Sequence, residues 1–99
     1  MDVFDWLAEW YKSCCDGDWE HGYGVRINTL DNPGWSVDIN IEDTILEEKT
    51  FEKIAIDNGD NDWIFCKVEN KFFNGAGDPD KLRKMLEIFR DWVDQSIKA

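Results

Sequence analysis

The residues best suited to chemistry gather in one stretch near the start of the chain, Cys15 to Gly24. It holds the only histidine of the 99-residue sequence, His21, together with the carboxylates Asp16, Asp18 and Glu20. Carboxylates ligate hard cations and histidine ligates zinc, so the cluster could form a metal site or supply a general base. A small metal-binding protein or an enzyme that uses this cluster is therefore one hypothesis.

The spacing of the cluster favours a structural role instead. A calcium loop of the EF-hand type spreads its ligands over a longer segment that ends in a glutamate, and a zinc site takes several nitrogen or sulfur ligands. Asp16 and Gly17 are turn formers, and an aspartate oxygen in a turn accepts hydrogen bonds from nearby backbone N–H groups. We expect no cofactor, and we expect a set of five residues to hold a first helix against a sheet: Asp16, Asp18, Trp19, Glu20 and His21.

The elements that would position this stretch follow from hydrophobic periodicity. Apolar residues from Val3 to Cys14 recur at helical spacing and predict an amphipathic helix. Apolar and polar residues alternate from Tyr23 to Thr29 and again from Trp35 to Ile41, which predicts two strands. The turn-forming residues Asp31 to Gly34 between them predict a hairpin.

A second pair of strands is predicted at Phe51–Asp57 and Asp62–Asn70, and the segment Lys71–Gly77 is predicted to be a loop. Asp78 followed by proline is typical of a helix start, so the last helix should run from Pro79 to Ile97. The element order is α-β-β-β-β-α. We therefore predict one α+β domain over residues 1–99, an antiparallel four-stranded meander with both helices on one face.

The charge of the chain restricts its partners. The net charge is −11, and residues 31–62 alone carry ten acidic side chains against two basic ones. A field of this sign repels nucleic acid and anionic membranes and attracts basic proteins. We expect no nucleic acid and no membrane as partner, although the acidity could also serve solubility alone in a generic acidic adaptor domain.

Cysteine usage and the first residues predict a cytoplasmic protein. Cys14, Cys15 and Cys66 form an odd set without a CxxC spacing, and adjacent cysteines rarely pair with each other. The start of the chain lacks the basic and apolar regions of a signal peptide, and no apolar run approaches the length of a membrane span. Reduced thiols in a reducing compartment are the simplest interpretation.

Several motifs together resemble a known family. They are Trp6-Leu7 with Trp10-Tyr11, Cys15 to His21, Tyr23-Gly24, Thr29 to Trp35, and Asp62-Trp63. In these residues the chain resembles the immunity protein 53 family of bacterial polymorphic toxin systems, over nearly its whole length. The resemblance implies a small cytoplasmic protein that binds and neutralises a cognate toxin by stoichiometric contact, without catalysis. It predicts no particular toxin and no oligomeric state.

The acidic residues and the tryptophans suggest where such a toxin would bind. Trp19, Trp35 and Trp63 stand at the edges of predicted elements beside acidic residues, so they are expected on a mixed aromatic and acidic surface. The acidic segment 31–62 should mask a basic surface of the toxin. The predicted contact set is Trp35, Asp38, Glu42, Asp57, Asp60, Asp62 and Trp63.

Overall fold

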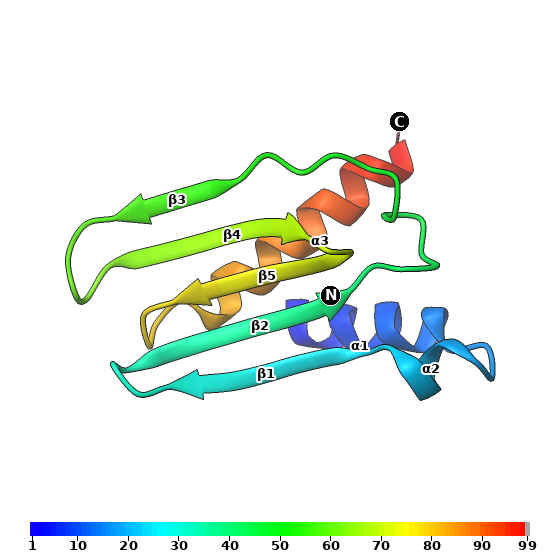
Figure 1. The fold of residues 1–99 in the computed structure, drawn as a ribbon, viewed down its shortest axis with the longest axis horizontal. Helices are drawn as coiled ribbons and strands as arrows, with labels where there is room; N and C mark the ends of the chain where they lie inside the picture. The colour runs from blue at the N-terminus through cyan, green and yellow to red at the C-terminus, as the bar shows by residue number, and fades with distance from the viewer. Residues whose placement is uncertain (99) are drawn as a thin grey trace.

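The computed structural model describes residues 1–98, in which five antiparallel strands form one sheet and two long helices lie on the same face of it (Figure 1). Among these residues, no helix combines the length and the hydropathy needed to cross a lipid bilayer. The elements are α1 (Val3–Cys14), α2 (Trp19–Gly22), β1 (Val25–Leu30), β2 (Gly34–Asn40), β3 (Ile54–Asp57), β4 (Trp63–Glu69), β5 (Phe72–Gly77) and α3 (Leu82–Lys98).

The sheet has the strand order β1-β2-β5-β4-β3, so the predicted four-stranded meander is wrong in two respects: there is a fifth strand, and β2 pairs with β5 and not with the next strand in sequence. The segment Lys71–Gly77, predicted to be a loop, contains the central strand β5. Phe73 lies opposite Ile39 of β2 and opposite Val68 of β4. The α+β class and the antiparallel pairing agree with the prediction, and the fifth strand corrects it.

Two local features explain why β5 does not look like a strand in the sequence. The β4–β5 turn is made by Asn70 and Lys71, both with positive φ (54° and 64°), as in the tight turns that suit a hairpin. Gly75 also interrupts the expected run of large apolar residues. A Cβ atom on Gly75 would lie 2.9 Å from the sulfur of Met85 and would displace this side chain of α3, so glycine leaves room for Met85 to pack against the sheet.

The core lies between the helices and the covered face of the sheet. Phe73 at the centre of the sheet and Phe89 of α3 are fully buried, with ring centroids 5.2 Å apart. Trp10 of α1 meets the same Phe89 edge-on at 4.9 Å, so one aromatic ring joins both helices to β5. The link between β2 and β3 crosses one end of the sheet and is held there by Trp92, whose Nε1–H donates to the carbonyl of Thr50 at 2.8 Å.

Helix boundaries differ from the prediction mainly at α3. The first helix has the predicted bounds, and the carboxylate of Asp2 accepts a hydrogen bond from the backbone N–H of Phe4 at 2.7 Å, as an N-cap does. The last helix begins at Leu82 and not at Pro79, because Asp78, Pro79 and Asp80 form a separate turn before it. The carboxylate of Asp78 holds that turn by accepting a hydrogen bond from the backbone N–H of Asp80 at 2.8 Å.

Candidate interaction surface

The segment Cys15 to Gly24, which holds His21 and three carboxylates, forms a corner between α1 and β1. The carboxylate of Asp16 accepts from the backbone N–H groups of Asp18 and Trp19, both at 3.0 Å, and these bonds lower its pKa, that from Trp19 most. Glu20 accepts from the N–H groups of Asp16 and Gly17. The pKa of Glu20 is lowered by hydrogen bonds from its own backbone N–H and from the backbone N–H groups of Asp16 and Gly17. The carboxylates are thus occupied by the backbone of a turn in which Gly17 has φ +97°.

The corner does not gather metal ligands. Within residues 1–98, no three His, Cys, Asp or Glu side chains lie close enough together to hold a metal ion. Trp19, which the sequence placed on a surface, is 4% exposed, so that prediction is wrong. Its ring packs edge-on against Trp10 and its Nε1–H donates to the carbonyl of Glu42 at 2.9 Å, because the one-turn helix α2 directs it inward.

The predicted contact residues divide between three regions of the structure. Glu42 follows β2 at the end of the sheet where α2 lies, and its carboxylate accepts a hydrogen bond from the hydroxyl of Tyr23. That bond is the main cause that raises the pKa of Tyr23 to about 12. Asp38 lies in the middle of β2, on the face without helices. The remaining five residues gather at the opposite end of the sheet: Trp35, Asp57, Asp60, Asp62 and Trp63.

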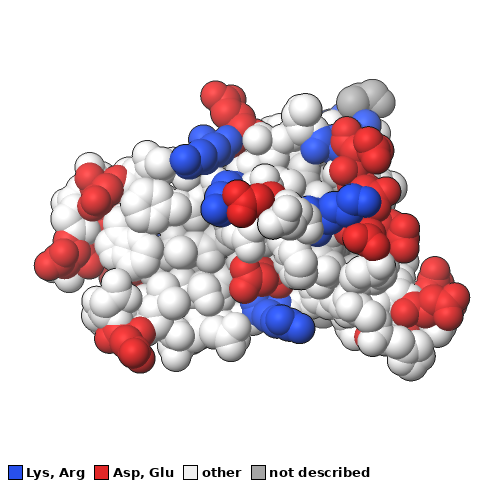
Figure 2. Space-filling model, viewed as in Figure 1, with Lys and Arg blue, Asp and Glu red and all other residues white. Residues whose placement is uncertain are grey.

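Three turns meet at that opposite end: β1–β2, β3–β4 and β5–α3. Figure 2 shows acidic groups around this end, at the left of the view, with no basic group near them on the visible face. At the other end, acidic and basic groups are mixed. We call this region the acidic end and define it by five exposed carboxylates: Asp31, Asp57, Asp60, Asp62 and Asp80.

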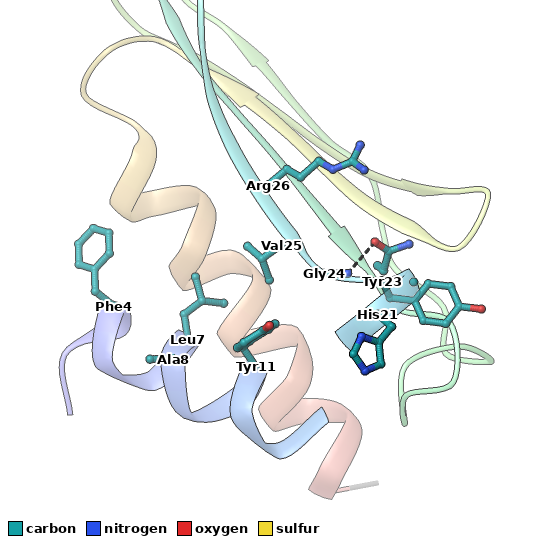
Figure 3. A pocket seen from close by; sticks show the side chains of 11 residues that line it. Phe4, Leu7, Ala8, Tyr11, His21, Tyr23, Gly24, Val25 and Arg26 are labelled. Atoms are coloured by element: carbon teal, nitrogen blue, oxygen red, sulfur yellow. Dashed lines mark hydrogen bonds between the residues drawn. The ribbon is translucent and has the colours of Figure 1, made fainter. Parts of the chain in front are cut away.

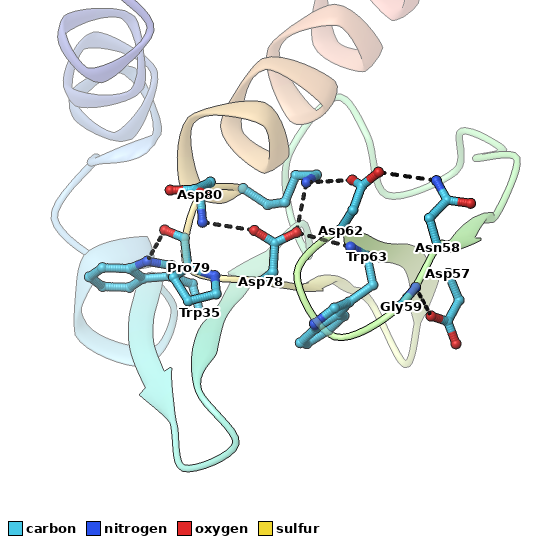
Figure 4. Close-up of polar contacts among 10 residues, drawn as sticks. Trp35, Asp57, Asn58, Gly59, Asp62, Trp63, Asp78, Pro79 and Asp80 are labelled. Atoms are coloured by element: carbon cyan, nitrogen blue, oxygen red, sulfur yellow. Dashed lines mark hydrogen bonds and ion pairs between the residues drawn. The ribbon is translucent and has the colours of Figure 1, made fainter.

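An ion pair between the buried Asp78 and the partly exposed Lys81 holds the acidic end together (Figure 4). The side chain of Asp78 is fully buried and lies 2.7 Å from the amino group of Lys81, and it accepts the backbone N–H of Trp63 at 2.9 Å. The hydrogen bond from Lys81 is the main cause that lowers the pKa of Asp78 to about 2. The same amino group lies 2.8 Å from Asp62, so β4 and the start of α3 are joined by one cation.

The other carboxylates of the acidic end lack such a partner. No ion pair between described residues includes Asp31, Asp57, Asp60 or Asp80, whereas Lys81 already serves two carboxylates. Unpaired surface carboxylates on one end of a small protein project a negative potential into solvent. This end is therefore suited to meeting a basic surface.

Two half-buried tryptophans stand among these carboxylates in fixed positions. The Nε1–H of Trp35 donates to the carbonyl of Pro79 at 3.0 Å, which ties β2 to the turn before α3 (Figure 4). The ring of Trp63 lies 5.7 Å from that of Phe65 on the uncovered face of the sheet. Phe65 is 40% exposed, so an aromatic surface borders the acidic end.

Sequence reasoning missed Asp31, Asp80 and Lys81 as parts of this surface. Asp31 was recognised as a turn residue and Asp80 lay beside a recognised helix start. Successive antiparallel strands put their turns at alternate ends of a sheet, so a correct strand count would have brought the three turns together. The missing signal was β5, which returns the chain to this end before α3.

The sequence model of a protein family described as Immunity protein 53 matches residues 4–94 of the chain. The chain belongs to the immunity protein 53 family. No match was found among curated proteins or among solved structures. Membership of the immunity protein 53 family connects the chain to toxin neutralisation in general terms, a role that is generally not enzymatic.

Proposed function

We propose that the protein neutralises a cognate toxin by binding it stoichiometrically in the cytoplasm, without catalysis. The observation that carries this proposal is the family match over residues 4–94. The three cysteines are free thiols, which is compatible with a reducing compartment. The partner is a protein and neither a nucleic acid nor a membrane, since the net charge of −11 opposes both.

We further propose that the toxin presents a basic surface to the acidic end. Its exposed carboxylates supply long-range attraction, and Trp63 and Phe65 beside them supply apolar contact area once the proteins meet. Electrostatic attraction of this kind mainly raises the association rate and excludes partners of the wrong charge. The contact therefore includes Trp35, Asp57, Asp60, Asp62 and Trp63, whereas Glu42 lies outside it.

Co-expression with a candidate toxin from a neighbouring gene tests the proposal. We expect growth to be restored and the two proteins to co-purify in a fixed ratio. Asp57→Asn with Asp60→Asn should weaken rescue, because both side chains are exposed and the change keeps their shape. Glu48→Gln with Glu52→Gln removes the same charge from exposed positions outside the acidic end and should leave rescue unchanged.

The same experiment separates this proposal from a generic acidic adaptor. An adaptor would also bind an unrelated basic protein and would respond equally to both pairs of substitutions. Failure of the wild-type protein to protect cells from the adjacent toxin would contradict the proposed function as a whole. Equal protection by the two double variants would contradict only the assignment to the acidic end.

A further inference from the structure

Strand β1 has one side without a partner. Among residues 1–98 it pairs with β2 alone and forms an outer edge of the sheet. The backbone N–H of Asn40 donates to the carbonyl of Gly24 at 3.0 Å, so Gly24 directs its carbonyl toward β2. Along an antiparallel strand, successive residues direct their backbone N–H and C=O groups alternately to the two sides. Val25, Ile27 and Thr29 therefore direct these groups away from β2. These groups can pair with a further strand.

A groove of about 620 Å³ runs below this edge, between β1 and α1. Figure 3 shows Leu7 and Tyr11 of α1 on one side of it and Val25 of β1 on the other. Phe4 and Tyr11 along its α1 side are 42% and 40% exposed, and Ile27 of β1 is 40% exposed. The edge thus combines free backbone groups with an apolar groove for the side chains of an added strand.

The charge of this region differs from that of the rest of the surface. Within the described part of the chain, no carboxylate lines the groove, although the protein carries 22 acidic side chains. The charged or titratable groups that line it are Tyr11, His21, Tyr23 and Arg26. Beside it, Arg83 lies over the ring of Phe4 at 4.9 Å and pairs with Asp2 at 3.3 Å. The acidic end attracts a basic protein more strongly than this groove does. At the groove, two copies of this acidic chain can approach without carboxylates of the lining facing each other.

The opposite edge of the sheet is less suited to pairing. Strand β3 has four residues, against six in β1, and Lys53 and Asp57 stand at its two ends. Short edge strands with charged residues resist the addition of another strand. Of the two edges, β1 is therefore the one that can extend the sheet.

We propose that β1 pairs with β1 of a second copy, antiparallel and centred on Ile27, to form a symmetric dimer with a continuous sheet. In this register Val25 faces Thr29 of the second copy, and Arg26 faces Asn28 of the second copy, so no like charges stand opposite each other. The β-branched side chains of Val25, Ile27 and Thr29 from each copy lie over the groove of the other. This proposal does not depend on the proposed function, because Asp57, Asp60, Asp62 and Asp80 of the acidic end lie in the β3–β4 and β5–α3 turns, away from β1.

Light scattering coupled to size-exclusion chromatography, over a wide range of protein concentration, tests the dimer. We expect the mass to rise to twice that of the monomer for the wild type. Ile27→Lys should stay monomeric at every concentration, since the two lysines would face each other at the symmetry axis. Ile56→Lys, at an isoleucine of the other edge that is 46% exposed, should dimerise like the wild type. A monomeric wild type, or a dimer that survives Ile27→Lys, overturns the proposal.

A disulfide trap gives a second test that does not depend on a destabilising charge. In a Cys14→Ser, Cys15→Ser background, Ile27→Cys should form an intermolecular disulfide on mild oxidation. The Cα atoms of such a hydrogen-bonded pair lie about 5.5 Å apart, which suits a disulfide. The matched variant Ile56→Cys should not cross-link. Equal cross-linking at both positions, or no cross-linking at position 27, overturns the proposed dimer.

Discussion

Gly34→Ala is the substitution that most directly probes how the acidic end is assembled. Gly34 begins β2, and a Cβ atom there would overlap the carbonyl oxygen of Gly77 at the end of β5. It would also lie 3.2 Å from the ring of Trp63. The first neighbour is backbone and cannot rotate away, so β2 must shift against β5 or the pairing of Trp35 with Gly77 must open.

The expected cost follows from two opposing effects. Overpacking of a closely packed site costs about 1–3 kcal/mol of folding free energy. Replacing glycine by alanine also lowers the conformational entropy of the unfolded chain, which stabilises the fold by about 0.4–1 kcal/mol. The net loss is therefore about 1–2 kcal/mol, and in a domain of this size each kcal/mol lowers the melting temperature by roughly 4–8 °C.

Thermal denaturation followed by circular dichroism measures this effect, and Gly24→Ala is its control. A Cβ atom on Gly24 meets no atom within 4 Å, so that variant should melt at or slightly above the temperature of the wild type. Since Trp63 must move in Gly34→Ala, toxin binding should weaken as well. If both variants melt at the wild-type temperature, the close contact between Gly34 and Gly77 does not stabilise this end of the sheet.

Three further predictions concern titratable groups. The hydrogen bond from Lys81 lowers the pKa of Asp78 from the usual 3.8 to about 2. The ionised carboxylate therefore stabilises the fold above about pH 4, and this stabilisation is lost as the pH falls toward 2. The difference in melting temperature between the wild type and Asp78→Asn should shrink over that interval. The hydrogen bond to Glu42 raises the pKa of Tyr23 to about 12, so in a Tyr11→Phe background ultraviolet titration should show ionisation near that pH, and Glu42→Gln should lower it. Burial raises the pKa of Cys66 to about 11. In a variant with Cys14 and Cys15 replaced by serine, the remaining thiol should therefore react with a disulfide reagent only after denaturation. Rapid reaction of the folded protein would show that Cys66 is accessible.

The parts of the fold that follow from local patterns were predictable. Helix α1 has a clear apolar stripe and an aspartate cap, and its bounds agree with those from the sequence. The β1–β2 hairpin carries alternating residues around a turn with proline and glycine, and the two strands pair as predicted. Burial alternates along most of β2, whereas in β1 only Val25 and Leu30 are partly buried. Such features depend on neighbours a few residues apart, which a sequence displays directly.

The parts that depend on distant contacts were not predictable. Strand β5 is interrupted by Gly75, whose side-chain space is taken by Met85, ten residues later in α3. Its turn uses Lys71 at a positive φ that glycine usually takes, so no turn signal marked it. The same error hid part of the acidic end: Asp31 and Asp57 share one end of a four-stranded meander as well, but Asp80 joins them only because β5 returns the chain to this end.

The proposed binding of a cognate toxin at the acidic end rests on opposite charge. Stopped-flow measurement of the association rate at low and at physiological salt tests it most directly. We predict a rate that falls steeply with salt, and at low salt a lower rate for Asp57→Asn with Asp60→Asn than for Glu48→Gln with Glu52→Gln. A rate that is unchanged by salt and equal for the two double variants would contradict the account.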